Sequence, residues 1–376
     1  MKFENVHLAS IGALLPEEVW SSDDLEQRLQ PLYQRLKLPE GRLELMSGIA
    51  QRRVWPVGTV PSGPSIQAGK LAVEAAGIDP AQIGCLIHAS VCRDFLEPAT
   101  ASRVHHGIGL SSDCWVYDVS NACLGLINGA VQIAMMIESG AIEAGIVVGT
   151  ENSRMLLEST IAALNADTSL ARKDIKGAFA SLTIGSGSCA WLLAHRRHAP
   201  AASVIETGIA EARTRYHDLC VSDSDSAGAA MQPLMETDSE TLMAEGIATG
   251  VAAFEKLLRE SGWRRESIDR SVCHQVGSRH RSAMLSAMQL PPESDSVSFP
   301  RLGNTGSVAL PLTVASAAQS GVLQPGHQVA MLGIGSGINS VMLATRWGET
   351  VIAGNIDQIA GGTTAEGVST GANASS

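Results

Sequence analysis

Two blocks of the sequence repeat the same succession of predicted elements, and this internal similarity restricts the possible folds more than any other feature. Residues 123–151 predict an apolar helix that stops at a Ser-Gly pair, a connector and a buried strand. Residues 304–337 predict the same succession, and Gly140 corresponds to Gly321 at an offset of 181 residues (321 − 140). The chain is therefore expected to be a fused duplication of two similar halves.

An earlier pair of blocks supports this duplication. Residues 78–91 and 264–276 each predict a turn, a short helical link and a buried strand. Short β-branched runs alternate with Ala- and Leu-rich stretches along most of the chain, which is typical of an α/β protein with helices covering its sheets. Because Cys123 and Asn304 begin equivalent helices, the two helix starts are expected to face each other across a pseudo-twofold axis.

The two predicted halves are followed by a third, different segment. The N-terminal half covers residues 1–195 and the C-terminal half covers residues 196–347. Residues 348–376 lose charge and apolar periodicity. This segment is therefore predicted to be a disordered tail outside the fold.

Composition excludes several classes of protein. The chain has 376 residues, of which 45% are hydrophobic, so it can bury a large core. A net charge of −11 argues against a nucleic-acid surface, and no apolar run is long enough for a membrane span or a signal peptide. The seven cysteines form no CxxC pair, so neither a disulfide framework nor a metal site is predicted. The protein is expected to be cytoplasmic.

Cys123 is the cysteine with the strongest chemical signal. It follows an extended run and precedes an apolar helix, and its small neighbours Ala122 and Gly125 leave room for a substrate. Backbone N–H groups and the helix dipole are expected to lower the pKa of its thiol and to favour a nucleophilic thiolate. The alternative is a buried structural cysteine.

Polar residues of the second half complete the candidate site. His274 follows a predicted strand and Asn304 begins the helix equivalent to that of Cys123, so the three side chains are expected to converge. An imidazole and an amide next to a thioester oxygen would stabilise the charge that develops in acyl transfer. The alternatives are a core histidine for His274 and a helix cap for Asn304.

The glycine-rich segment 328–339 predicts a different kind of backbone site. It lacks the GxGxxG spacing and the following acidic residue of a dinucleotide-binding loop. It can instead place the backbone N–H of Ser336 beside a carbonyl oxygen. Together with the N–H of Cys123, this group is predicted to form an oxyanion hole.

Five segments together resemble the thiolase superfamily, specifically its β-ketoacyl synthase III type of condensing enzyme: DVSNACLG (118–125), TIGSGSCAWLLA (183–194), CHQV (273–276), GNTGS (303–307) and GIGSG (333–337). The resemblance covers about residues 1–347. It implies a five-layered αβαβα fold, a homodimer and a catalytic site at Cys123, His274 and Asn304. The acyl substrate would be carried by coenzyme A or by the phosphopantetheine of an acyl carrier protein, with no other cofactor.

Within this superfamily, the segment SVCRDFLEPATAS (90–102) resembles the OleA family, whose members join two fatty acyl-CoA molecules head to head. The resemblance implies that Glu97 reaches across the dimer into the partner's site. Condensing two plain acyl chains requires a base that removes an α-proton, whereas a malonyl thioester forms its carbanion by losing carbon dioxide. The alternative for Glu97 is a carboxylate that precedes Pro98 at a helix start.

Two arginines are candidates for binding the substrate's carrier. Residues 48–55 correspond to the region that contacts the coenzyme A entrance in the family, so Arg52 and Arg53 are candidates for its phosphates. The alternative is that both are solvated surface charges. The HQVG sequence at 274–277 differs from the usual HQAN of β-ketoacyl synthase III, which leaves acyl chain length and carrier open.

The leading hypothesis is a non-decarboxylative Claisen condensation of two fatty acyl thioesters to a β-keto acid through an acyl-Cys123 intermediate, as in olefin biosynthesis. One alternative is a synthase III-like enzyme that is decarboxylative or joins two β-ketoacyl chains to an α-pyrone. Another is a non-catalytic subunit that binds acyl chains. Acyl-CoA or acyl carrier protein thioesters and downstream pathway enzymes are the expected partners.

Overall fold

The computed structural model describes residues 1–172, 174–222, 235–357 and 359. Most strands belong to one ten-stranded sheet with the order β11-β12-β13-β8-β1-β7-β6-β4-β5, and β14 pairs with β1 beside this path. These strands are β1 (Val6–Leu14), β4 (Ile83–Ala89), β5 (Trp115–Val119), β6 (Ala144–Glu151), β7 (Gly187–His195), β8 (Ser203–Ala212), β11 (Arg270–Cys273), β12 (Gln328–Gly335), β13 (Asn339–Arg346) and β14 (Val351–Gly354). Two separate pairs are β2 (Glu18–Ser21) with β3 (Gln51–Val54) and β9 (Cys220–Ser222) with β10 (Met235–Thr237).

The strand order repeats outward from the central pair of β1 and β8. On one side β7, β6 and β4 follow β1, and on the other side β13, β12 and β11 follow β8. In both directions the first two pairings are antiparallel and the third is parallel. This equivalence confirms that the fold consists of two pseudo-duplicated halves.

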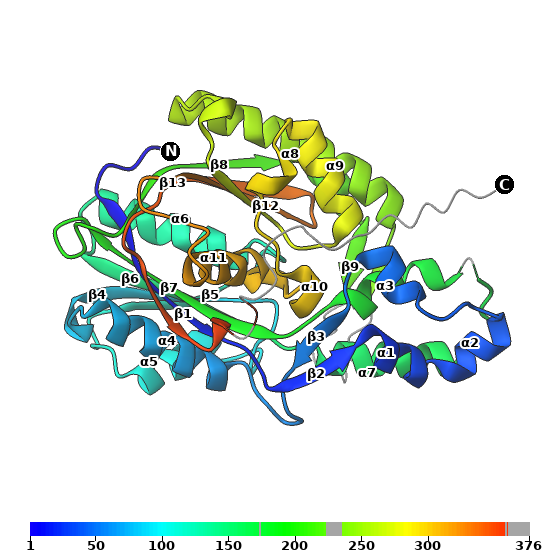
Figure 1. Cartoon of the computed structure of the whole chain (residues 1–376). Coiled ribbons are helices and arrows are strands. Elements are labelled where there is room, and N and C mark those ends of the chain that lie inside the picture. The colour runs from blue at the N-terminus through cyan, green and yellow to red at the C-terminus, as the bar shows by residue number, and fades with distance from the viewer. Residues whose placement is uncertain (173, 223–234, 358, 360–376) are drawn as a thin grey trace.

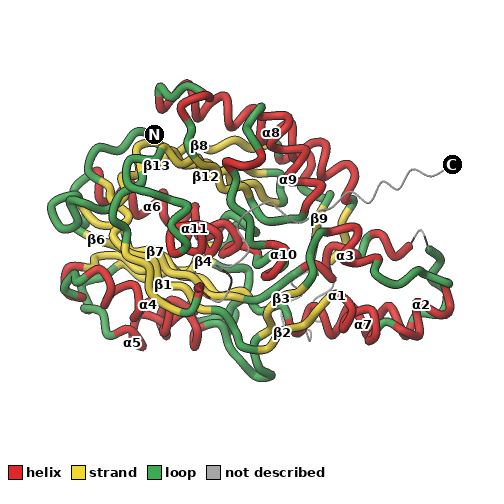
Figure 2. Tube along the Cα trace, viewed as in Figure 1, coloured by secondary structure: helices red, strands yellow, loops and turns green. Residues whose placement is uncertain are grey.

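The α-helices are α1 (Ser22–Arg28), α2 (Gln30–Leu36), α3 (Arg42–Ser47), α4 (Ser62–Ala76), α5 (Thr100–Ile108), α6 (Gly125–Glu138), α7 (Arg154–Ala166), α8 (Ser239–Ser261), α9 (Ser278–Met288), α10 (Phe299–Leu302) and α11 (Ala309–Gln319). Six of them form three layers on the strands of this sheet, while α1, α2, α3 and α7 pack together at one side. α4 and α5 cover the N-terminal strands, α8 and α9 cover the C-terminal strands, and α6 and α11 lie between the halves (Figure 1). The alternating helix and strand layers in Figure 2 confirm the predicted αβαβα arrangement.

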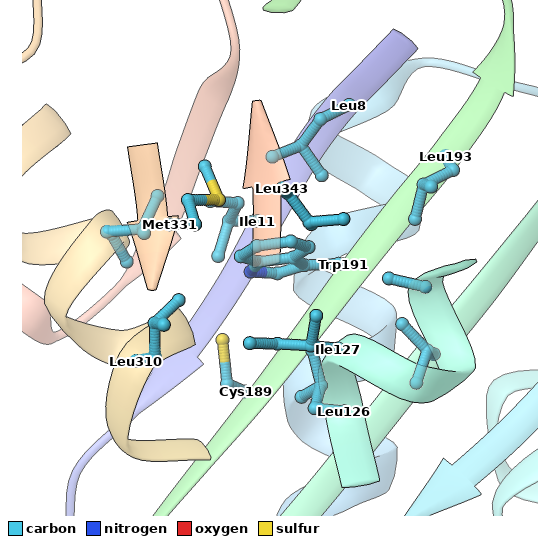
Figure 3. Packing of buried hydrophobic residues seen from close by; sticks show 14 of the residues in the cluster. Leu8, Ile11, Leu126, Ile127, Cys189, Trp191, Leu193, Leu310, Met331 and Leu343 are labelled. Carbon is cyan, nitrogen blue, oxygen red and sulfur yellow. The ribbon is translucent and has the colours of Figure 1, made fainter. Parts of the chain in front are cut away.

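The two central helices are apolar on every side because strands of both halves pack against them. Residues 309–317 of α11 are all buried, and so is most of α6. Trp191 of β7 lies among Ile127 of α6, Ile11 of β1 and Leu343 of β13 (Figure 3). This core fixes where both central helices begin.

The Ser-Gly stops that revealed the repeat end both central helices in the same way. Gly140 and Gly321 have φ values of 74° and 72°, in the left-handed region that glycine adopts without steric cost. The N–H of Gly140 bonds to the Ile137 carbonyl and the N–H of Gly321 to the Ala318 carbonyl, each at 3.0 Å. The sequence repeat therefore has a matching backbone geometry.

The disordered tail predicted for residues 348–376 is wrong where the structure describes this segment. β14 pairs in parallel with β1 from Ser10 onward, where β8 no longer covers the β1 edge. Ile356 and Ile359 are buried in the main core, with exposed fractions of 1% and 3%. A four-residue strand is too short to show a sequence period, so only the available β1 edge explains its conformation. Residues 360–376 lie outside the described residues.

Candidate active site

Cys123 lies in a tight turn between β5 and α6, called here the Cys123 elbow (residues 120–124). Ala122 adopts a φ of 43°, a left-handed conformation that is uncommon for a residue with a side chain. α6 begins at Gly125 and has no side-chain cap. The elbow therefore presents Cys123 next to an uncapped helix start.

The electrostatic surroundings of Cys123 differ from those expected for a stabilised thiolate. Burial, followed by the nearby Glu151 carboxyl and Cys220 thiol, raises the pKa of the Cys123 thiol to about 12. The predicted lowering of this pKa is therefore wrong, because removal from water outweighs the helix dipole. In the resting protein Cys123 is a thiol.

The end of β12 lies against the Cys123 elbow. A Cβ atom on Gly335 would be 3.6 Å from the backbone nitrogen of Cys123 and 3.2 Å from Cγ of Leu124. The strand end at Gly335 therefore packs closely against the elbow, without a side chain between it and this N–H group. Ser336 follows directly, so the two backbone segments predicted to form the oxyanion hole are neighbours.

Asn304 lies in the corresponding turn before α11. Its backbone N–H donates to the Thr183 carbonyl and its carbonyl accepts the Gly185 N–H, each at 2.9 Å. Its side-chain Oδ1 accepts the N–H of Gly306 at 3.0 Å. Because Oδ1 already has this partner, the Nδ2 group is the side of the amide that can donate to a substrate oxygen.

His274 follows the last residue of β11 and is 4% exposed. Its backbone N–H donates to the Leu332 carbonyl of β12 at 3.1 Å, three residues before Gly335. Burial, assisted by the neighbouring His280, lowers the pKa of the His274 imidazole to about 3. The ring is therefore neutral near neutral pH, with one donor and one acceptor nitrogen.

A buried ion pair holds β11, the strand directly before His274. The Asp295 carboxylate accepts the Cys273 N–H at 3.0 Å and the Ser271 hydroxyl at 3.1 Å. Its second oxygen pairs with Nε of Arg281 at 2.7 Å. These bonds restrict the backbone from which the imidazole projects.

Glu151, the last residue of β6, is a site residue that sequence reasoning missed. It is 3% exposed, and its Oε1 accepts bonds from the Ser307 hydroxyl and N–H and from the Val91 N–H. Burial raises the pKa of its carboxyl, although these bonds oppose the shift. The available signal was an acidic residue directly after the buried run VVGT (147–150).

Glu97 lies outside this buried centre. It is exposed between β4 and α5, next to Phe95 and Leu96, whose exposed fractions are 50% and 58%. Within the described part of the chain its carboxylate makes no hydrogen bond or ion pair. One chain therefore does not place Glu97 among the buried site residues.

Arg52 and Arg53 do not have the surroundings that phosphate binding requires. Arg52 is 1% exposed, and its guanidinium donates to the Trp20 and Leu182 carbonyls. Arg53 donates to the Pro16 carbonyl at 3.2 Å. Burial lowers the pKa of both side chains, that of Arg52 to about 10. The predicted role in binding coenzyme A is therefore corrected: both guanidinium groups are used to hold the backbone around β2 and β3.

An open hollow lies at the start of α9, four residues after His274 in the chain. Its lining consists of Met243, Ser278, Arg279, Ser282 and Ala283. Arg279 is exposed and presents its charge there. This arginine, rather than Arg52, is accessible to an anionic ligand.

The described residues contain no group of three or more His, Cys, Asp or Glu side chains that could hold a metal ion. No helix among them is long and apolar enough to cross a membrane.

The layered fold and the arrangement around Cys123 define a thiolase-fold condensing enzyme of the ketosynthase III type. Residues 258–347 match the family described as 3-oxoacyl-acyl-carrier-protein synthase III, C terminal. Two proteins named acyl-CoA:acyl-CoA alkyltransferase are similar over most of the chain. The protein from Shewanella oneidensis is 39% identical over 352 residues and that from Xanthomonas campestris 33% over 347 residues, each match covering 92% of this chain and 100% of the relative.

A solved structure agrees with these relatives. Xanthomonas campestris OleA with bound lauric acid and lauroyl-CoA matches with a TM-score of 0.86 and 32% identity, covering 92% of this chain and 100% of that chain. The present chain belongs to the acyl-CoA:acyl-CoA alkyltransferase family, also called the OleA family. The resemblance inferred from the sequence segments is confirmed.

Proposed function

We propose that this chain joins two fatty acyl-CoA molecules head to head, without loss of carbon dioxide, and yields a β-keto acid. The proposal rests on one observation: two relatives named acyl-CoA:acyl-CoA alkyltransferase match this chain at 39% and 33% identity over their full lengths. The exposed Glu97, which supplies a carboxylate base, supports the same chemistry.

In the first step, Cys123 becomes acylated. Its sulfur attacks the carbonyl carbon of the first acyl-CoA, the bond from that carbon to the coenzyme A sulfur breaks, and the thiol proton ends on the departing sulfur. The backbone N–H groups of Cys123 and Ser336 stabilise the negative oxygen of the tetrahedral intermediate.

In the second step, a second acyl-CoA loses an α-proton to the partner subunit's Glu97. The carbanion attacks the acyl-Cys123 carbonyl carbon, and the carbon–sulfur bond to Cys123 breaks. The released sulfur takes up a proton and Glu97 gives up the one it accepted, so that the thiol and the carboxylate are restored. The Asn304 amide and the N–H of the neutral His274 ring stabilise the enolate oxygen of the second thioester. Water then cleaves the β-ketoacyl thioester to the β-keto acid and free coenzyme A. Because the proton goes to a carboxylate, the reaction uses no cofactor beyond the carrier of its substrate.

The proposed partner subunit is a second copy of this chain. β5 is an edge strand of the main sheet, and its Trp115 is 67% exposed. Near it, Val91, Phe95 and Leu96 are 52%, 50% and 58% exposed. An unpaired strand edge beside several exposed apolar side chains is a favourable surface for another chain to cover. Covering this surface would bring Glu97 to the site of the other subunit.

Arg279 is the proposed contact for the phosphates of coenzyme A. It lines the hollow at the start of α9, where its charge and the helix start both favour an anion. The same group would serve a phosphopantetheine phosphate, so this contact does not by itself choose between the two carriers.

A product analysis tests the proposed function. The purified protein is incubated with long-chain acyl-CoA alone and then with malonyl-CoA added, while free thiol is followed. We expect thiol release without malonyl-CoA, together with a β-keto acid or its ketone by mass spectrometry. Release that depends on malonyl-CoA would indicate a decarboxylative synthase, free fatty acid alone would indicate hydrolysis, and no release would indicate a non-catalytic acyl-binding subunit.

A further inference from the structure

The two halves provide an internal comparison at the ends of the equivalent strands β6 and β12. Glu151 is the last residue of β6, and Gly335 is the last residue of β12. Gly335 lies against the Cys123 elbow, whereas Glu151 lies against the equivalent turn before α11, where it bonds to Ser307. Each half thus supplies the residue that meets the helix start of the other half.

These equivalent positions differ in chemistry. At the Cys123 elbow, Gly335 presents no side chain to the helix start, where even a Cβ atom would be 3.2 Å from Cγ of Leu124. At the turn before α11, the Glu151 carboxyl occupies the corresponding space: it accepts the Ser307 N–H at 3.3 Å, and a Cβ atom on Gly306 would be 3.1 Å from its carboxyl carbon. The chain therefore places its own carboxyl group at one helix start and no side chain of the opposite strand end at the other, where the N–H groups predicted to bind a substrate oxygen lie.

Glu151 also connects two segments that the proposed condensation uses. Ser307, which donates two bonds to it, lies three residues after Asn304. Val91, whose N–H donates to the same oxygen at 3.4 Å, begins the segment that contains Glu97. A single buried side chain thus contacts both the Asn304 turn and the Glu97 segment.

The charge of Glu151 is not compensated. Within the described residues none of its hydrogen bonds comes from a lysine, arginine or histidine, and it forms no ion pair. Burial raises the pKa of its carboxyl, and its proximity contributes to the raised pKa of Cys123. A buried carboxyl without a cation is unfavourable for stability, so its place between the Asn304 turn and the Glu97 segment points to a role in the reaction.

We propose that Glu151 is a positioning residue for the condensation step. Its buried carboxyl lies at the start of α11, the helix start equivalent to the Cys123 elbow, and fixes the Asn304 turn relative to the Glu97 segment. This inference rests on the proposed function. It predicts that Glu151 influences the second step through Asn304 and leaves the acylation of Cys123 largely unchanged.

The test compares Glu151→Ala and Glu151→Gln with wild type, and uses Glu26→Ala as a matched control. Glu26 is also a buried carboxyl, 6% exposed, which accepts the Gly41 and Leu43 N–H groups, but in the separate cluster around α1. In E151A, acyl-Cys123 should form at close to the wild-type rate, while β-keto product formation falls about 10²-fold. E151Q keeps an oxygen that accepts from Ser307, so its turnover should stay within about tenfold of wild type.

A double variant distinguishes positioning from a merely structural role. Asn304→Ala already removes the amide that Glu151 positions. Adding E151A to this variant should therefore lower turnover by a further factor of less than about three. Multiplied losses in the double variant would overturn the proposal. Equal losses of acylation and condensation in E151A would also overturn it. Equal losses are the pattern expected for the control Glu26→Ala, in which the loss of a buried carboxyl acts only on stability.

Two further outcomes complete the test. If E151A does not fold, Ser307→Ala removes the donor instead, and the same split between the two steps is expected. A fully active E151A overturns this inference but not the proposed function. Where E151A does not fold, a fully active S307A has the same meaning. A wild-type protein that forms no β-keto product overturns the proposed function and this inference with it.

Discussion

The buried centre around Cys123 and the exposed segment 91–99 around Glu97 differ in their relation to solvent and in their partners. Cys123 is half-buried and His274 is buried, and desolvation raises the pKa of the thiol and lowers that of the imidazole. Glu97 is exposed beside apolar side chains that are also exposed. The difference teaches that the groups proposed to hold the acyl chains lie in or near the interior of one chain, while the proposed base stays outside. The two reaction steps should therefore respond to different changes.

The exposed segment is held at both of its ends. The Asp94 side chain is fully buried and accepts the Ser62 N–H at 2.9 Å. At the other end, Asp118 accepts the N–H groups of Thr100 and Ala101 at 2.8 Å each. Glu97 thus lies at an exposed tip between two fixed points, which limits the entropy lost when a partner covers it.

The largest effect is expected in the buried centre. Cys123→Ala removes the nucleophile of the first step and with it the acyl-enzyme that the second step requires, so product formation should fall by at least about 10⁴-fold. Peptide mass mapping of wild type after incubation with acyl-CoA should find the acyl group on Cys123. Cys114→Ala is the control and should keep its activity. An acyl group on Cys92 or Cys273, with Cys123 unmodified, would contradict the assignment.

The next effect separates the exposed segment from the centre. Glu97→Gln keeps the shape of the side chain but removes the basic carboxylate, so condensation should fall by about 10² to 10⁴-fold. The acyl group should still be found on Cys123, because the first step does not use this base. Equal loss of both steps would remove the distinction between the two regions.

Mixing variants tests whether Glu97 acts across the dimer. In a mixed dimer of E97Q and C123A, one site carries both substitutions and the other carries neither. With random subunit exchange the mixture should recover about a quarter of wild-type activity. Continued inactivity with exchange confirmed would mean that Glu97 acts within its own chain or has no role.

Within the centre, the two polar residues should affect the second step more than the first. His274→Ala or Asn304→Ala removes a donor to the enolate oxygen, so condensation should fall by about 10² to 10³-fold while acyl-enzyme still accumulates. Rapid quenching with mass analysis of the intact protein measures both quantities. Product formation at the wild-type rate in both variants would exclude these roles.

The raised pKa of Cys123 predicts a pH dependence of its labelling. Because this pKa is about 12, the thiol form predominates at lower pH, and the reactive thiolate fraction increases about tenfold per pH unit. Alkylation of Cys123 by iodoacetamide should therefore increase about tenfold per unit from about pH 6 to about pH 9. A plateau within this range would show that the thiolate is already stabilised, contrary to the raised pKa.

The smallest effect is expected at the fixed ends of the exposed segment. Asp118→Asn weakens the bonds to Thr100 and Ala101, so condensation should fall by about threefold to tenfold and acylation should not change. Asp113→Asn, at an exposed neighbouring residue, is the control. An equal decrease in the control would show that the effect does not depend on the position of Glu97.

The sequence predicted the features that depend on local pattern or on repetition. The repeat led to two halves with equivalent central helices, and the segments around Cys123, His274 and Asn304 led to the family. The environment of each side chain was not predictable, because it depends on distant parts of the chain. Arg52 is buried against the Leu182 carbonyl, 130 residues away, and the importance of Glu151 appears only through a contact 156 residues away.

The same reasoning explains the wrong pKa direction for Cys123. A helix start is visible in the sequence, but the depth of its burial is set by the opposite half, whose strand end Gly335 packs against the elbow. Local pattern therefore predicted which atoms react and did not predict the dielectric surroundings that set their protonation.

The pairing of β14 with β1 has a consequence for how the protein is made. Ser10 is aligned with Val351, 341 residues later in the chain (351 − 10), and the side chain of Asn355 bonds to both backbone groups of Leu15. During synthesis on the ribosome, the edge of β1 beyond its contact with β8 has no partner until residue 354 has emerged. The N-terminal half is therefore completed only after the C-terminal half has been synthesised, through one of the most non-local contacts that the chain can form.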